Sequence, residues 1–311
     1  MDLESLWATL DDRLLPLLRS YRERLPTLDV SVKADKTLLS EADLAAQELI
    51  VESILEIFPD SGFVAEEDDQ PLPRHGSPLW IIDPIDGTSQ FVDPLGREYC
   101  SVVCRLDEGT PTGAYVLAPE LGTDTSPISI HWSAEHVTVN GMPAVSLPQR
   151  STPRRASVTR SKNSMARLYE SELESIGSQL KLRTTSQTVD MIRTCLDLSE
   201  WTGTSASQFD LFYRRDQKLW DGAAGIGLAG AMGRLARPTH PLRRNFCLTF
   251  DPDERWRVGR RDPRCHPGDQ GYPSGAPGRR RPPAQQSSPV AEVGTSAARW
   301  QVVDFTGTGP P

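Results

Sequence analysis

The pattern of hydrophobic and polar residues predicts alternating helices and strands over the first 150 residues. Leucines and one tryptophan recur every three or four positions between residues 2 and 24, with charged residues between them, as in an amphipathic helix. Similar spacing predicts a second helix from Ser40 to about Phe58. Short apolar or alternating runs predict strands at 30–36, 63–65, 80–82, 99–106, 113–118, 128–132 and 136–139. Because Asn140-Gly141 is a strong turn signal, we expect residues 1–150 to form an antiparallel meander with helices on one side.

The pattern changes after a polar, basic segment at 148–155, which we take as the boundary between two halves. The second half, 151–233, is expected to be α/β. A strand is predicted at 156–159 and a helix near 164–178, followed by a second alternating layer from 181–185, 191–198 and 209–213. Trp220-Asp221 then precedes a run of small residues to Met232 that predicts a closely packed helix.

The last segment, residues 234–311, has a different composition. It holds 12 of the 26 prolines and no long periodic apolar run, so we expect an irregular, mostly disordered tail. With 13 Arg, no Lys and 7 acidic residues, the tail carries a net charge of +6. Because the net charge of the whole chain is −8, residues 1–233 carry −14. An acidic body argues against nucleic acid as a partner.

Cysteine usage and hydropathy indicate the cellular compartment. The five cysteines are odd in number and show no paired metal-binding spacing, which is typical of reduced, buried thiols. No apolar stretch reaches the ~18 residues of a membrane span, and the N-terminus is acidic rather than a basic signal region. We therefore expect a soluble cytoplasmic protein that does not bind membranes.

The candidate chemistry is concentrated in residues 80–88, Trp-Ile-Ile-Asp-Pro-Ile-Asp-Gly-Thr. An apolar strand ends there in two carboxylates, Asp83 and Asp86, followed by a Gly87-Thr88 step that can open a helix. Carboxylates can share hard cations, and backbone N–H groups at a helix N-terminus can receive phosphate oxygens. A Pro-Asp-Gly turn without function would also fit this sequence.

Three further acidic positions have both a structural and a chemical interpretation. Asp43 lies three residues after Ser40, so it could simply cap the second helix. The run Glu66-Glu67-Asp68-Asp69 could be a solvated loop or contribute to a cation site. Asp221 could be only the N-cap of the helix that follows it.

Three motifs together resemble the inositol monophosphatase family of magnesium-dependent, lithium-sensitive phosphatases. They are Gly62-Phe63-Val64-Ala65-Glu66-Glu67, Asp83-Pro84-Ile85-Asp86-Gly87-Thr88 and Trp220-Asp221-Gly222-Ala223-Ala224-Gly225, and the resemblance spans about residues 30–232. It implies an α+β fold, a layered α/β/α/β/α sandwich. It also implies two or three Mg²⁺ ions, inhibition by Li⁺, and metal ligation by Glu66, Asp83, the carbonyl of Ile85, Asp86 and Asp221.

The same resemblance implies catalytic roles for Asp43 and Thr88, with Asp43 orienting Thr88 and the attacking water. It places Lys33, Gly87, Thr88 and Arg214 at the substrate, although Lys33 could equally be a solvated surface residue. The expected activity is hydrolysis of a small phosphorylated metabolite, an inositol monophosphate or similar polyol. A homodimer is possible in such a family.

Two alternatives remain open. Arg214 and Arg215 fall where inositol-specific relatives tend to carry an acidic residue, so a 3'(2'),5'-bisphosphate nucleotide is a competing substrate. The tail departs from the family, whose members usually continue into final strands, and only Gly233-Arg234-Leu235 begins such a pattern. A catalytically impaired scaffold protein is therefore the second alternative.

Overall fold

The computed structural model describes the side chains and backbone of most of the chain up to residue 233. The described ranges are 2–32, 38–67, 72, 77–134, 136–148, 150, 152–159, 170–182, 185–203, 208–214 and 218–233. Beyond them it describes the backbone of four short strands at 236–238, 246–250, 256–260 and 300–303. Lys33, Asp68, Asp69 and Arg215 lie outside the described residues.

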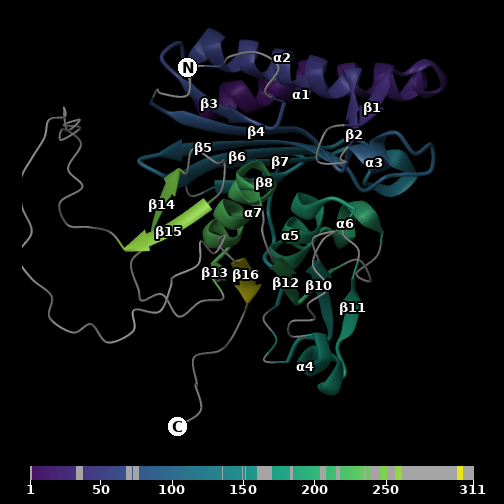
Figure 1. Cartoon of the computed structure of the whole chain (residues 1–311), viewed down its shortest axis with the longest axis vertical. Helices are drawn as coiled ribbons and strands as arrows, with labels where there is room; N and C mark the ends of the chain where they lie inside the picture. The colour runs from purple at the N-terminus through teal and green to yellow at the C-terminus, as the bar shows by residue number, and fades with distance from the viewer. Residues whose placement is uncertain are drawn as a thin grey trace, which may run out of the picture.

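A seven-stranded sheet forms the centre of the molecule (Figure 1). Its strands follow one another in sequence order: β3 (Gly62–Ala65), β4 (Leu79–Asp86), β5 (Cys100–Asp107), β6 (Thr110–Ala118), β7 (Ile128–Ser133), β8 (His136–Val139) and β9 (Met142–Pro143). β3 and β4 pair in parallel, and every later neighbour pairs antiparallel. The predicted antiparallel meander is therefore confirmed from β4 to β9, as is the turn at Asn140-Gly141, whereas the parallel pairing of β3 with β4 departs from it.

Helices cover both faces of this sheet (Figure 1). α1 (Leu3–Glu23) and α2 (Glu41–Ile57) pack on one face, while α5 (Gln187–Cys195) and α7 (Leu219–Ala231) pack on the other. Neighbouring side chains of β4 alternate between these layers, with Ile82 beside α1 and α2 and Ile81 beside α5 and α7. Because each buried isoleucine stabilises the fold by about 1.5–3 kcal/mol, a one-residue shift of the strand would be costly.

A second sheet underlies α5 and contains strands from distant parts of the chain. Its order is β11 (Gln179–Lys181), β10 (Arg155–Thr159), β12 (Leu211–Arg214), β16 (Trp300–Val303) and β13 (Ala236–Pro238). Phe212 faces α5 and α7, whereas Leu211 and Tyr213 face Leu173 of α4 (Glu170–Ser175). The order of layers is thus helices, sheet, helices, sheet, helix, which confirms the expected α/β/α/β/α sandwich.

The remaining elements are short. They are the 3₁₀ turns at Leu25–Thr27 and Thr123–Thr125, β1 (Val30–Val32), β2 (Leu38–Ser40), α3 (Thr88–Phe91), α6 (Ser199–Thr202), β14 (Phe246–Phe250) and β15 (Trp256–Arg260). β13 to β16 are four short strands within the segment that the sequence predicts to be an irregular tail. Each is only three to five residues long, too short for periodicity to separate it from the surrounding Pro- and Arg-rich sequence.

One predicted element has the wrong type. Residues 191–198, expected to belong to an alternating layer, fall largely within helix α5. The helix begins at the N-cap Ser186, whose side chain accepts a hydrogen bond from the backbone of Val189. All nine of its residues are buried, although five of them, including Asp190 and Arg193, are polar. A helix of nine residues is shorter than the window of about 11–18 residues over which a helical period is normally recognised.

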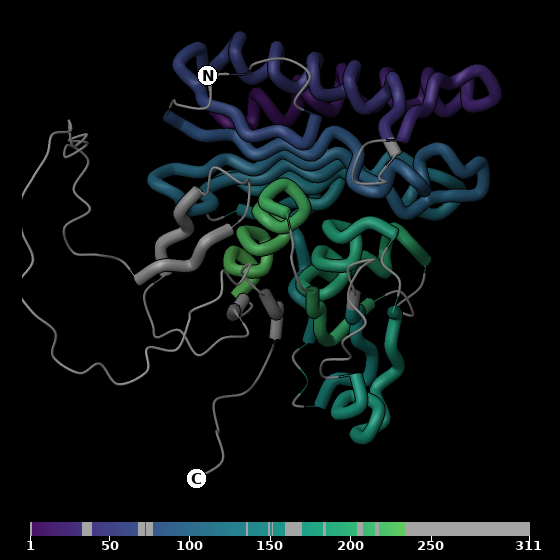
Figure 2. The backbone as a smooth tube through the Cα atoms, viewed as in Figure 1, coloured from purple at the N-terminus to yellow at the C-terminus, as the bar shows by residue number. Residues whose placement is uncertain are grey.

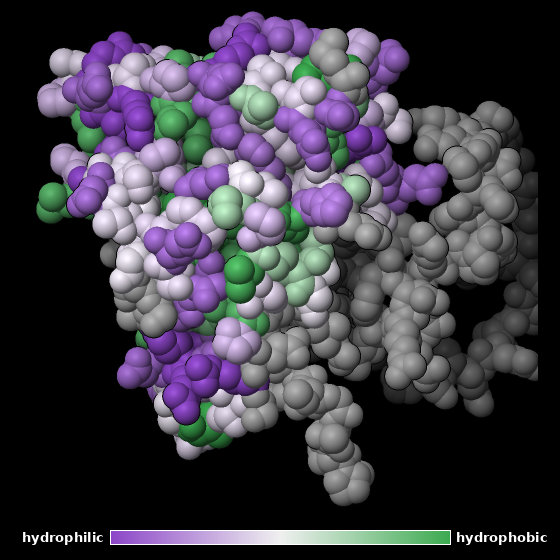
Figure 3. Space-filling view, turned by 180° about the vertical axis from the view of Figure 1, so that it is seen from behind, coloured by the Kyte–Doolittle hydropathy of each residue, from purple (hydrophilic) through white to green (hydrophobic). Residues whose placement is uncertain are grey.

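Two views summarise the arrangement and the surface. Figure 2 shows the chain completing α1, α2 and the seven-stranded sheet before it enters the second layer of helices. On the face drawn in Figure 3, hydrophobic residues form small groups separated by hydrophilic ones. None of the helices in the described part of the chain has the length and hydropathy needed to cross a membrane.

Candidate active site

Three carboxylates from distant parts of the sequence meet between the central sheet and α7. Asp83 and Asp86 lie on β4 and Asp221 lies in the first turn of α7, and one oxygen of each lies within 4.8 Å of the others. Residues three apart on a regular strand face opposite sides. β4 has an irregularity between these two positions, and such a bulge can turn both carboxylates to one side. We call these three residues the carboxylate cluster.

Burial makes the carboxylate cluster electrostatically unfavourable on its own. Asp83 is 1% exposed, and neither of its carboxylate oxygens has a hydrogen-bond partner among the described residues. Burial, together with the negative charges of Glu66, Asp86 and Asp221, raises the pKa of Asp83 well above its usual range. Burial and Asp86 likewise raise the pKa of Asp221 to about 7. Buried anions without partners are rare in folded proteins unless a cation neutralises them, so this oxygen-rich site fits a hard divalent cation.

Glu66 approaches the same cluster from the end of β3. Its backbone N–H donates to the carbonyl of Ile82 at 3.0 Å, which extends the pairing of β3 with β4 by one residue. Its charge contributes to the raised pKa values of both Asp83 and Asp221. The neighbouring Glu67 is 4% exposed, and its backbone N–H donates to Gln47 at 3.1 Å, so this part of the acidic run is not a solvated loop.

The N-terminus of α5 holds two members of the carboxylate cluster. Asp86 accepts hydrogen bonds from the Ser186 hydroxyl at 2.8 Å and from the backbone N–H groups of Gln187 and Thr188 at 3.2 and 2.6 Å. The side-chain amide of Gln187 donates to Asp221. Burial still raises the pKa of Asp86, although these donors oppose the shift. These residues were not predicted from the sequence, in which the N-cap pattern of Ser186 is the signal for them.

Asp43 and Thr88 form a second, smaller constellation. The Thr88 hydroxyl lies 3.2 Å from Asp43 Oδ1 and 3.2 Å from the carbonyl oxygen of Ile85. The other Asp43 oxygen accepts from the backbone N–H of Ser40 at 2.8 Å. Asp43 therefore caps α2 and holds Thr88 at the same time, so the two interpretations of this residue are compatible.

Gly87 occupies a position where any other residue would be strained. Its φ of 99° lies in the left-handed region, which favours glycine. A Cβ atom at this position would lie 3.0 Å from the carbonyl oxygens of both Glu98 and Thr185. The β4–α3 turn is thus enclosed by two segments, one from each half of the chain.

Arg214 lies beside the carboxylate cluster, at the end of β12. Its positive charge opposes the upward shift of the pKa of Asp221. Arg214 Nε is buried and has no hydrogen-bond partner in the described part of the chain. Asp221 itself is not a helix cap, because the N-cap of α7 is Lys218. The proposed contact of Lys33 with substrate falls outside the described residues.

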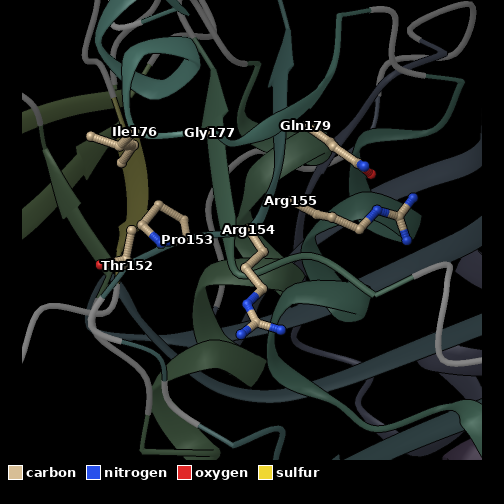
Figure 4. Close-up of a pocket in the computed structure, with 7 residues that line it drawn as sticks. All are labelled: Thr152, Pro153, Arg154, Arg155, Ile176, Gly177 and Gln179. Atoms are coloured by element: carbon tan, nitrogen blue, oxygen red, sulfur yellow. The ribbon is translucent and has the colours of Figure 1, made fainter.

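A pocket of about 560 Å³ lies at the opposite end of the second sheet (Figure 4). It is lined by Thr152, Pro153, Arg154, Arg155, Ile176, Gly177 and Gln179. β10 begins at Arg155, whereas its far end pairs Thr159 with Arg214. The pocket is therefore separated from the carboxylate cluster by the length of β10 and includes none of the residues predicted to carry chemistry.

Comparison with known proteins agrees with the three sequence motifs. Residues 8–266 match the model of the inositol monophosphatase family. The 3'(2'),5'-bisphosphate nucleotidase CysQ of Shigella flexneri is 28% identical over 66% of this chain and 78% of its own. The inositol-1-monophosphatase of Rhizobium meliloti is 29% identical over 70% of this chain and 77% of its own.

Similarity among solved structures extends to the fold. The structure of an IMPase/NADP phosphatase complexed with Mg²⁺ and phosphate superimposes with a TM-score of 0.54 at 20% sequence identity. The match covers 74% of this chain and 84% of that one.

Proposed function

Because this chain belongs to the inositol monophosphatase family, we propose that it is a Mg²⁺-dependent phosphatase that hydrolyses a phosphate monoester of a small polyol, such as an inositol monophosphate. The observation that supports this most strongly is the carboxylate cluster, three buried acids within 4.8 Å of one another. Phosphate monoesters hydrolyse extremely slowly without a catalyst, so an enzyme must neutralise charge and position a nucleophile. The cluster supplies the anionic ligands for the first task.

The proposed metal ligands are Glu66, Asp83, the carbonyl of Ile85, Asp86 and Asp221. All donate oxygen atoms, as Mg²⁺ prefers. Divalent cations bound there would activate water and stabilise the leaving oxygen. The chain's own contribution is to hold these ligands rigidly: Ser186, Gln187 and Thr188 orient Asp86, and Gln187 also orients Asp221.

Thr88 and Asp43 are proposed to handle the proton of the attacking water. When the Thr88 hydroxyl donates to Asp43 Oδ1, a lone pair of its oxygen is free to accept a hydrogen bond from water. Asp43 keeps this orientation because its second oxygen is held by the backbone of Ser40. Gly87 allows the turn that presents Thr88, and its backbone is proposed to contact the phosphate.

A second substrate class is favoured by one specific observation. Arg214 lies beside Asp221, its Nε is buried and has no hydrogen-bond partner among the residues that the structure describes, and a guanidinium is well suited to bind a second phosphate group. A similar relative is named as a 3'(2'),5'-bisphosphate nucleotidase. A nucleotide bisphosphate is therefore the alternative substrate.

A panel assay of phosphate release distinguishes these candidates. The purified full chain would be tested with inositol 1-phosphate and with an adenosine 3',5'-bisphosphate, each with and without Mg²⁺ and Li⁺. The proposal predicts Mg²⁺-dependent release that Li⁺ inhibits, and Arg214→Met should lower turnover of the bisphosphate selectively if the second class is correct. If neither substrate releases phosphate and Mg²⁺ does not bind, the phosphatase proposal fails in favour of a scaffold protein.

A further inference from the structure

A set of buried and partly buried charges lies next to the carboxylate cluster and belongs to none of the proposed catalytic groups; the side chains of Glu98 and Lys181 are 27% and 23% exposed. Lys181 Nζ lies 2.9 Å from Glu98 Oε2 and 2.7 Å from Asp190 Oδ1. Arg193 pairs with the other oxygen of Glu98. We call these four residues the ion-pair network. Its two acids and two bases balance, so, unlike the carboxylate cluster, it needs no cation.

Glu98 is the member of this network that joins the two halves of the chain. It precedes β5, whereas its partners all lie between residues 181 and 193. Its carboxylate accepts from Lys181 of β11, from the Thr185 hydroxyl just before α5, and from Arg193 within α5. The Glu98 side chain therefore contacts both the segment just before α5 and a residue within the helix. Burial opposes ionisation, but the charges of Arg193 and Lys181 lower the pKa of Glu98 to about 2.

The segment that Glu98 holds, the start of α5, also supplies the hydrogen-bond donors to the carboxylate cluster. Thr185, which it binds, directly precedes Ser186, the first of the donors to Asp86. The backbone carbonyls of Glu98 and Thr185 also enclose Gly87 on two sides. A change in the distance between residues 98 and 185 would therefore move the β4–α3 turn and the α5 donors together.

We propose that Glu98 is a positioning residue for the cation site, an inference that rests on the proposed metal-dependent function. It holds the N-terminus of α5 against the β4–α3 turn, so that Ser186, Gln187 and Thr188 keep Asp86 and Asp221 at cation-binding distance. Glu98 contacts neither substrate nor cation. Its effect is transmitted through the backbone of residues 185–188.

Calorimetric titration of Mg²⁺ into the full chain tests this proposal without relying on turnover. Groups that orient a metal ligand are typically worth about 10–100-fold in metal affinity, and Glu98 acts one step further away. We therefore expect Glu98→Gln to weaken Mg²⁺ binding about tenfold and its turnover to recover at saturating Mg²⁺. Glu120→Gln is the matched control, because Glu120 also holds two arginines, Arg22 and Arg97, both at 2.8 Å.

The outcomes separate the inference from the function on which it rests. If the Glu98 and Glu120 variants both bind Mg²⁺ like wild type, the positioning role is wrong while the metal site stands. If wild type binds no Mg²⁺, the metal assignment fails and the positioning role fails with it. Should Glu98→Gln not fold, Thr185→Val decides, because it removes one contact with Glu98 and leaves every charge in place. It should weaken Mg²⁺ binding less than tenfold but measurably, and unchanged binding would overturn the proposal.

Discussion

The carboxylate cluster and the ion-pair network both contain acids packed around α5, but their charges are balanced differently. In the network, Glu98 and Asp190 face Lys181 and Arg193, so the charges are balanced within the fold. In the cluster, Asp83 has no hydrogen-bond partner among the described residues. Asp221 has a cation nearby, Arg214, whose positive charge opposes the upward shift of the pKa of Asp221. The first arrangement is complete without a ligand, and the second is not.

The difference separates a structural from a functional use of the same residue type. Folding places acids inside a protein at a cost unless their charge is compensated, so a cluster of three acids with more negative than positive charge around it implies either a bound cation or protonation. The pKa of Glu98 is lowered to about 2 while that of Asp221 is raised to about 7; burial also raises the pKa of Asp190, although the charge of Lys181 opposes that shift. A search for binding sites in such folds should therefore look for the acids that the fold leaves unbalanced.

The largest expected effect comes from removing a charge from the carboxylate cluster. Asp83→Asn and Asp86→Asn should each reduce Mg²⁺-dependent phosphate release to background, because each removes an anionic ligand without creating a cavity. In the absence of Mg²⁺, Asp83→Asn should not lower the melting temperature, since it relieves repulsion. Wild-type turnover of either variant at limiting Mg²⁺ would show that the residue is not a ligand.

Breaking the Thr88–Asp43 pair should cost less. Thr88→Ala and Asp43→Ala should each lower turnover about 100-fold, and the double variant should be little worse than either, because residues that act as a unit are not additive. Asp43→Ala should also lose about 1 kcal/mol of stability through its capping contact. Kinetics and thermal melts of the three variants measure both effects, and near-normal turnover of Asp43→Ala would leave it only a capping role.

The ion-pair network should respond to neutralisation in the opposite way to the cluster. Glu98→Gln leaves Lys181 and Arg193 facing one acid instead of two, so the free energy of unfolding should fall by about 1–3 kcal/mol. Urea denaturation of Glu98→Gln and Asp83→Asn without Mg²⁺ compares the two directly. Equal losses in both variants would remove the distinction between a balanced and an unbalanced group.

Whether the sequence could predict a contact of the site depended on how far apart along the chain the contacting residues lie. Asp83 and Asp86 share one motif and Asp221 lies in another, so a resemblance sufficed to propose them together, and the layered fold followed from it. The donors at residues 186–188 and the partners of Glu98 were not predicted, because they meet Asp86 and Glu98 only through the packing of a helix about 100 residues away. That helix was itself misassigned, because its nine residues are too few to show a helical period clearly.

The smallest expected effect is a pH dependence of the stability that has opposite signs for Asp221 and Glu98. For Asp221, whose pKa in the folded protein is raised to about 7 from an ordinary value of 3.8, stability without Mg²⁺ is highest below pH about 4 and is lost as the pH rises towards 7. For Glu98, whose pKa is about 2 against 4.5, stability is present above pH about 4.5 and is lost as the pH falls towards 2.

Thermal melts at pH 5 and pH 8, with and without Mg²⁺, measure the pH dependence of stability that is due to Asp221. Because the cation competes with protons for the carboxylate cluster, the rise in melting temperature on adding Mg²⁺ should be greater at pH 8 than at pH 5. Asp221→Asn should reduce that difference, and Glu98→Gln should reduce the loss of stability between pH 4.5 and pH 2 instead. A rise that is equal at both pH values would contradict the assignment of Asp221 as a ligand.

The most direct test of the central claim is the anomalous scattering of Mn²⁺ in crystals of the full chain grown with that ion. Mn²⁺ accepts the same oxygen ligands as Mg²⁺ and can be located without reference to activity. Our interpretation predicts an anomalous peak between the carboxylates of Asp83, Asp86 and Asp221, and none within the ion-pair network. Crystals that bind Mn²⁺ elsewhere, or that leave the carboxylate cluster empty at millimolar Mn²⁺, would contradict it.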